Sequence, residues 1–129
     1  MTLIPASHED LLTRPLFAHL ASIRPDRTPQ VNPMWFSWDG SHLRFTNTTT
    51  RRKYRNVTMD PHVAVSINDP DQPYRYLEIR GRVIRVDPDP EAAFFGELAS
   101  RYQLAMDGPP PDADDRVIFI VEPSAISFQ

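Results

Sequence analysis

Apolar and polar residues alternate along several short segments of the chain, the pattern expected for strands that bury one face. The clearest example is 62–67, which places three larger apolar residues on the same face. A longer strand is predicted over 74–86, with a bend at Gly81 because glycine weakens a strand interior. Both segments therefore predict a sheet with one face turned toward a core.

Turn-forming residues separate the other predicted strands. Arg24-Pro25-Asp26-Arg27 favours a tight turn between a strand over 16–23 and a return strand over 30–38. Asp39-Gly40 then predicts a two-residue hairpin turn before a strand over 43–46. These signals predict consecutive antiparallel hairpins.

Two helices are predicted among the strands. Asp60-Pro61 ends the first, over 51–59, because the residue before a proline is restricted away from the helical conformation. Asp89 caps the second, with Pro90 at its first helical position and an apolar stripe on one face. This second helix is expected to be the one substantial helix.

The remaining segments complete a mainly β pattern. A proline-rich loop at 107–115 precedes predicted strands at 116–122 and 125–128. About seven strands joined mostly by short turns favour a closed or nearly closed antiparallel barrel over a parallel α/β sheet. With 129 residues, the chain fits one such domain over residues 1–129 and is too short for separate cofactor and substrate domains.

Composition narrows the classes of function. A formal net charge of −3 argues against general nucleic-acid binding, and the four histidines show no metal-ligand spacing, so no metal site is predicted. No Gly-x-Gly-x-x-Gly motif supports a nicotinamide-binding Rossmann fold. No segment approaches the roughly 18 apolar residues that span a bilayer. Because the first ten residues also lack a basic and apolar leader, a soluble cytoplasmic protein is expected.

The most informative polar segment is 46–56, which places hydroxyls and amides before a cationic helix start. The amides and dipole of a helix N-terminus favour an anion, Arg51 adds a bidentate fork, and Lys53 adds a compact charge. This combination indicates a phosphate site. The alternative is a solvated basic turn, and composition alone does not choose between the two.

A second candidate site is Gln30-Val31-Asn32-Pro33-Met34-Trp35-Phe36. Because Pro33 cannot donate to a ladder, the strand is expected at an edge, bulged or interrupted there, which makes backbone polar groups available beside aromatic surface. A flat heteroaromatic ring fits such a place. The ordinary alternative is that Met34, Trp35 and Phe36 fill the barrel or a subunit interface.

A third candidate is Tyr74-Arg75-Tyr76, on the outer face of the long predicted strand. One hypothesis is that these side chains line a ligand site of a neighbouring subunit. The other is that they face solvent, with charges pairing across strands.

Four segments, taken in order and spacing, resemble the pyridoxamine-phosphate-oxidase-like family. They are Arg24-Pro25-Asp26-Arg27-Thr28-Pro29-Gln30-Val31, Trp35-Phe36-Ser37-Trp38-Asp39-Gly40, Arg51-Arg52-Lys53-Tyr54-Arg55-Asn56 and Tyr76-Leu77-Glu78-Ile79-Arg80-Gly81. Within that family the chain is similar to the small actinobacterial deazaflavin-dependent reductases, over about 11–121. The resemblance implies a split β-barrel homodimer, with two cofactors in grooves between the subunits.

The resemblance also implies roles for particular residues. Arg51 and Lys53 fall where the family holds the cofactor phosphate, and Thr46 falls where a hydroxyl assists. Pro33, Met34 and Trp35 fall beside the ring. Tyr74 and Tyr76 match positions that the second subunit contributes in some members of the family. The predicted cofactor-binding residues are Gln30, Pro33, Met34, Trp35, Thr46, Arg51, Lys53, Tyr74 and Tyr76.

The activity implied by the resemblance is that of a reductase dependent on coenzyme F420, a deazaflavin. It would transfer a hydride to an activated double bond of a small planar substrate. No catalytic side chain is identified, because 32–35 holds no residue that must act as acid or base. The alternatives are an FMN-dependent flavin reductase, an oxidase of the family's namesake type, and a carrier that binds F420 without turnover.

Overall fold

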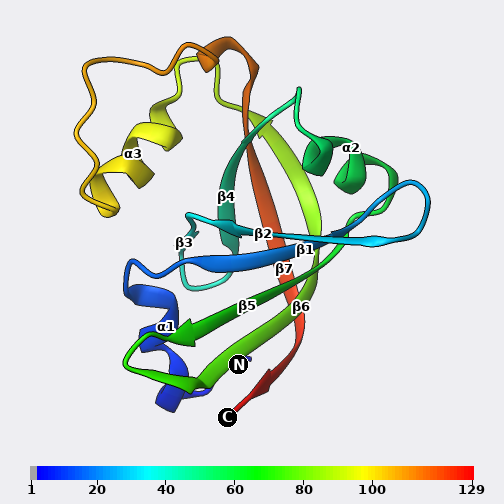
Figure 1. Cartoon of the computed structure of the whole chain (residues 1–129), viewed down its shortest axis with the longest axis vertical. Helices are drawn as coiled ribbons and strands as arrows, with labels where there is room; N and C mark the ends of the chain where they lie inside the picture. Colours follow the sequence, from blue (N-terminus) through cyan, green and yellow to red (C-terminus); the bar gives the residue numbers. More distant parts are fainter. Residues whose placement is uncertain (1–2) are drawn as a thin grey trace.

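Seven antiparallel strands form one continuous sheet in the computed structural model, which describes residues 3–129 (Figure 1). Met1 and Thr2, the first residues of the predicted domain, lie outside the described part. The strands are β1 (Ala18–Ile23), β2 (Pro29–Met34), β3 (Ser37–Trp38), β4 (Leu43–Thr48), β5 (His62–Asp69), β6 (Gln72–Pro88) and β7 (Arg116–Phe128). The helices are α1 (Asp10–Thr13), α2 (Arg52–Met59) and α3 (Ala93–Arg101), with 3-10 turns at Ala6–His8 and Ala113–Asp115.

The order of the strands explains why the sheet curls. Neighbouring strands follow the order β2-β1-β5-β6-β7-β4-β3, so β2 and β3 form its two edges. These two edge strands are also consecutive in the chain, separated by only Trp35 and Phe36. The sheet must therefore bend until its edges approach each other, which gives a half-barrel. The predicted mainly β, split-barrel fold with about seven strands is confirmed.

Apolar side chains fill the interior of the half-barrel. Val63, Val65 and Ile67 of β5 are buried, as their alternation predicted. The largest fully buried side chains come from five strands, α1, α3 and the link between β2 and β3. They are Phe36, Phe45, Phe119, Leu11, Leu12, Leu20, Leu43, Ile67, Leu77, Ile79, Leu98 and Val65. Since the interior is occupied, a large ligand has to bind at the surface of the barrel.

Gly81 marks an irregularity in β6, as predicted. The pairing with β7 shifts register between Arg80 and Gly81, and a Cβ atom at Gly81 would clash with the carbonyl oxygen of Glu122. Pro123 lies opposite Gly81 at this shift. The proline is accommodated because the ladder is already irregular at this point, so β7 continues through it. The prediction of two separate final strands, 116–122 and 125–128, was therefore wrong.

Two predicted boundaries are corrected by side-chain hydrogen bonds. The turn at Asp39-Gly40 is a four-residue loop, since Trp38 pairs with Leu43, and Asp39 Oδ1 accepts from the amide of His42 at 2.7 Å. Asp89 caps α3 as expected, but it does so from a distance: its Oδ2 accepts from the amide of Phe94 at 3.1 Å. The helix consequently begins at Ala93 and not at Pro90.

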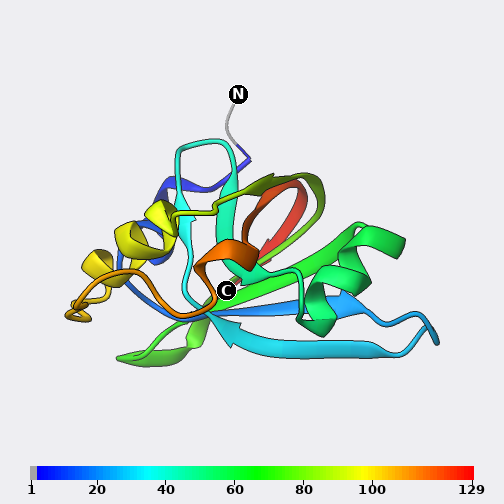
Figure 2. The same cartoon turned by 90° about the horizontal axis from the view of Figure 1, so that it is seen from above.

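The helices lie around the sheet rather than within it. Figures 1 and 2 show α2 and α3 on opposite sides of the sheet and α1 at the end where the C-terminus lies. No helix within residues 3–129 has the length and apolar character needed to cross a membrane. The position of α2 matters most for function, because its first residues face the groove between β2 and β4.

Candidate functional site

A cavity of about 410 Å³ lies between β2, β4 and the start of α2. It brings together six of the nine predicted cofactor-binding residues, from segments far apart in the chain. The lining residues are Phe17, Asn32, Pro33, Met34, Trp35, Thr46, Asn47, Arg51, Lys53 and Arg116. Residues of segment 46–56 and of segment 30–36, which the sequence analysis described as separate candidate sites, thus line one cavity.

Lys53 is a largely buried positive charge of this cavity, which Arg51 and Arg116 also line. Lys53 is only 8% exposed. Within residues 3–129 its side chain forms neither a hydrogen bond nor an ion pair. Burial lowers the pKa of Lys53, and the positive charge of Arg51 lowers it further. A buried ammonium without a counter-charge is costly, so an anionic ligand at this place would stabilise it.

Asn47 adds an unsatisfied donor at the same place. It is 4% exposed, and its Oδ1 accepts from the amide of Thr48 at 2.9 Å. Its buried Nδ2 has no hydrogen-bond partner among the described residues. Because buried polar groups are almost always paired in native proteins, this donor fits a ligand oxygen. Asn47 falls within the predicted polar segment 46–56, but the sequence analysis gave this residue no individual role.

Arg116 is a further lining residue that sequence reasoning missed. The pairing of Thr48 with Arg116 brings the start of β7 beside the end of β4. Arg116 Nη1 donates to Thr46 Oγ1 at 3.3 Å, and the guanidinium also pairs with Asp112. No local pattern links residues so far apart in the chain, so the sequence carried no signal for this contact.

The wall of the cavity at Trp35 is fixed by α3. The indole lies parallel to the ring of Tyr102, with centroids 5.0 Å apart and an interplanar angle of 7°. The Tyr102 hydroxyl donates to the carbonyl of Leu16 and accepts from the amide of Phe36 at 3.2 Å. Burial raises the pKa of Tyr102. The ring of Phe95 lies beside the same indole, with centroids 6.0 Å apart. Trp35 is therefore held by Tyr102 and Phe95 where it lines the cavity.

Gln30 does not line the cavity but supports it. Its Nε2 donates to Asn32 Oδ1 at 2.9 Å, and its Oε1 accepts from Asn56 Nδ2 at 3.2 Å. Asn56 is buried in α2 and also donates to Ser22 at 3.0 Å. Gln30 thereby connects α2 to β2 and orients Asn32, which does line the cavity.

Tyr74 and Tyr76 lie away from this cavity. Tyr74 is 86% exposed and borders a separate hollow with His8 and Arg75, while Tyr76 is half-buried on β6 opposite Asn68. Neither tyrosine reaches the cavity of its own chain. Their contribution to the site of a second subunit stays a prediction.

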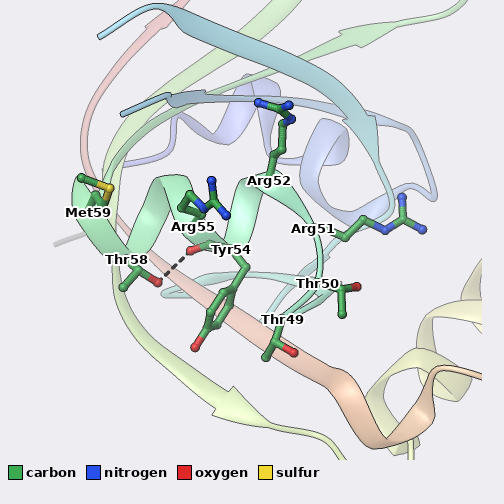
Figure 3. A pocket seen from close by; sticks show the side chains of 8 residues that line it. All are labelled: Thr49, Thr50, Arg51, Arg52, Tyr54, Arg55, Thr58 and Met59. Carbon is green, nitrogen blue, oxygen red and sulfur yellow. Dashed lines mark hydrogen bonds between the residues drawn. The ribbon is translucent and has the colours of Figure 1, made fainter. Parts of the chain in front are cut away.

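A second hollow of about 370 Å³ adjoins the first and shares Arg51 with it (Figure 3). In the close-up, Arg52 and Arg55 extend from one side of α2, and Arg51 extends from the turn before the helix. None of these three arginines forms an ion pair within residues 3–129. The complete lining is Thr49, Thr50, Arg51, Arg52, Tyr54, Arg55, Thr58 and Met59.

These features define a split-barrel protein with a basic cavity beside an aromatic wall. The sequence matches the family model described as pyridoxamine 5'-phosphate oxidase over residues 4–129, so the chain belongs to the pyridoxamine 5'-phosphate oxidase family. Because the match covers almost the whole chain, the resemblance seen in the sequence is confirmed.

Solved structures agree with this assignment. A structure described as F420 reductase is 56% identical, with a TM-score of 0.94, covering 96% of this chain and 98% of that one. A conserved hypothetical protein from Mycobacterium tuberculosis is 22% identical, with a TM-score of 0.76 and coverage of 99% and 85%. The HupZ protein of Group A Streptococcus is 16% identical, with a TM-score of 0.69 and coverage of 97% and 93%. A search of curated proteins found no match.

Proposed function

We propose that the protein is a cytoplasmic oxidoreductase that binds coenzyme F420 and reduces an activated double bond of a small planar substrate. The observation that carries this proposal is the buried, unpaired ammonium of Lys53 beside the unsatisfied Nδ2 of Asn47. Both groups call for an anionic, oxygen-rich ligand. The 56% identity to a structure described as F420 reductase supports F420 as that ligand.

The cavity residues divide into two roles in this proposal. Lys53, Arg51 and Thr46 hold the phosphate, because they offer two charges and a hydroxyl to the same cavity. Met34 and Trp35 lie beside the ring and exclude water from it. When bound, the reduced deazaflavin supplies the hydride, so the protein mainly binds, orients and shields.

A homodimer is part of the proposal. The barrel interior is filled by its own side chains, so the ligand occupies a surface groove that a second subunit would cover. Phe17, which lines the cavity just before β1, and Val31 of β2 are 56% and 62% exposed. Apolar side chains of this size at the surface favour contact with another chain. Tyr74 and Tyr76 would then complete the site of the partner subunit.

Titration with the two candidate cofactors tests the proposal. Protein produced in a host that lacks the deazaflavin should be colourless, and added F420 should bind more tightly than FMN by calorimetry. A tightly bound yellow chromophore that releases FMN would overturn the choice of F420. Light scattering should report about twice the 14.8 kDa chain mass. A stable monomer that still binds the cofactor would contradict the shared groove.

Two alternatives have support in particular observations. The pyridoxamine 5'-phosphate oxidase family match favours FMN and flavin reductase or oxidase chemistry. The cavity lining holds no carboxylate or imidazole among the described residues, which favours a carrier that binds F420 without turnover. Oxidation of the reduced cofactor with a panel of quinones, enones and tetrapyrroles separates enzyme from carrier, since only an enzyme accelerates it.

A further inference from the structure

The guanidinium of Arg116 is largely buried and is held by several side chains at once. Its side chain is 11% exposed. Its Nε and Nη2 donate to the two carboxylate oxygens of Asp112 at 3.0 and 3.1 Å. The guanidinium carbon also lies 4.4 Å from the centroid of the Phe95 ring. A two-point carboxylate pair together with a ring contact fixes the plane of the guanidinium.

Nη1 takes no part in the hydrogen bonds to Asp112, and it donates to Thr46 Oγ1 at 3.3 Å. A threonine hydroxyl has one hydrogen to donate and two lone pairs to accept with. Because the arginine occupies a lone pair of Oγ1, the hydroxyl hydrogen is turned away from the guanidinium. Thr46 lines the cavity together with Lys53, so that hydrogen is available to a ligand oxygen.

Asp112 determines how Arg116 acts. The carboxylate balances the charge of Arg116 and engages two sides of its fork. The ammonium of Lys53, in contrast, has no balancing group within residues 3–129. Lys53 and Arg51 therefore provide uncompensated charge for an anion, and Arg116 provides orientation.

We infer that Arg116 is a positioning residue, which acts on the ligand's phosphate through Thr46 and is itself held by Asp112. The inference rests on the proposed function, since it concerns the same cavity and the same phosphate-bearing cofactor. It adds the residue that sets the Thr46 hydroxyl as a donor. It also connects the site to the proline-rich loop that Asp112 ends, so a change in that loop reaches the phosphate through Arg116.

A double-mutant cycle on Thr46→Val and Arg116→Gln tests the inference, with F420 and FMN as calorimetric probes. Each single variant should weaken binding roughly three- to tenfold, the loss of about one hydrogen bond. The double variant should bind no more weakly than Thr46→Val, because in this inference Arg116 acts on the ligand only through that hydroxyl. Losses that multiply in the double variant would show direct contact and overturn the inference.

Arg85→Gln is the matched control, since Arg85 pairs with Asp87 at 2.7 Å on an exposed part of β6. It should bind like the parent. If Arg116→Gln fails to fold by circular dichroism, Asp112→Asn replaces it in the cycle, and its loss should likewise disappear in the Thr46→Val background. A parent protein that binds neither F420 nor FMN would refute the proposed function, whereas binding with multiplied losses would refute the role of Arg116 alone.

Discussion

The hydroxyl of Tyr102 joins two segments that the sheet leaves unpaired, because it donates to the carbonyl of Leu16 and accepts from the amide of Phe36. Its ring meanwhile stacks on Trp35. A single residue at the end of α3 therefore holds the entry to β1, the link between the sheet edges and one wall of the cavity. Its hydroxyl and its ring act separately, so they can be tested separately.

Tyr102→Phe keeps the ring and removes the hydroxyl. We expect the free energy of unfolding to fall by about 1–2 kcal/mol, since two backbone groups lose their partner. Urea unfolding followed by circular dichroism measures the change. Tyr74→Phe is the control, because Tyr74 is 86% exposed, and it should unfold like the parent. Equal stability of parent and Tyr102→Phe would show that these hydrogen bonds contribute nothing net.

Lys53→Ala should weaken F420 binding roughly ten- to hundredfold, the value of a charge-assisted hydrogen bond of about 1.5–3 kcal/mol. Arg51→Ala should weaken it as well, because Arg51 lines the same cavity. Arg52→Ala should have a smaller effect, since Arg52 borders only the adjoining hollow. Calorimetric titration of all three variants tests the assignment. Parent-like binding by every variant would reduce the segment to a solvated basic turn.

Lys53→Met should stabilise the ligand-free protein while it abolishes tight binding. The lowered pKa of Lys53 means that the fold disfavours its charged form. We expect Tm at pH 7 to rise by a few degrees, as for about 1 kcal/mol in a chain of this size.

The pH dependence of that gain has a definite sign. Between the lowered folded pKa and the ordinary value of 10.5, the unfolded state binds more protons, so the parent becomes more stable as pH rises. The advantage of Lys53→Met should therefore shrink as pH rises through the folded pKa. Differential scanning fluorimetry from pH 7 to about 11, past the ordinary lysine pKa, measures it, and a constant gain over that whole range would contradict this account.

Gly81→Ala should destabilise the protein by about 3 kcal/mol or more, because the new Cβ atom meets the backbone of Glu122 and Pro123. Gly96→Ala provides the opposite case. A Cβ atom there meets nothing within 4 Å, and the position lies inside α3. Alanine at position 96 should stabilise by about 0.5–1 kcal/mol. Chemical unfolding of Gly81→Ala and Gly96→Ala distinguishes the clash with the backbone of Glu122 and Pro123 from a general effect of replacing glycine by alanine.

Arg75→Gln should reduce stability at neutral pH and have little effect in strong acid. The hydrogen bond and charge of Arg75 hold the pKa of Asp10 below its ordinary value. This stabilisation is present above the unfolded carboxyl pKa of about 3.9 and is lost as pH falls through the lower folded value. Thermal unfolding between pH 2 and 7 should show the two curves converging. Arg82→Gln, which removes an arginine without an ion pair within residues 3–129, should leave the curve unchanged.

Much of the fold was predictable because strand alternation is a local property. The burial of Val63, Val65 and Ile67 required only a period of two, and the bend at Gly81 required only the absence of a side chain. The loop after Trp38 was predicted too short. Its closure depends on the Asp39 carboxylate and not on the Asp-Gly dipeptide alone.

The candidate site was predictable only where its residues are neighbours in the chain. Arg51 and Lys53 stand together at the start of α2, so their shared cavity was visible as a motif. Arg116 and Tyr102 reach the site through the pairing of β4 with β7 and the packing of α3. Gln30 was assigned to the ligand, and its amide contacts Asn32 and Asn56. Its contact with a ligand stays a prediction, because sequence proximity does not show where a side chain points.

The two prolines of β2 limit strand addition at one edge of the sheet. Pro29 and Pro33 lie on the edge strand β2, four residues apart and therefore on the same side of the strand. Neither residue has an amide hydrogen to donate to an added strand. The opposite edge, β3, is only two residues long. Neither edge is therefore a good template for strand addition, which protects the chain against edge-to-edge aggregation. In the proposed homodimer, recognition would therefore depend on side chains and not on backbone amides of the sheet edges.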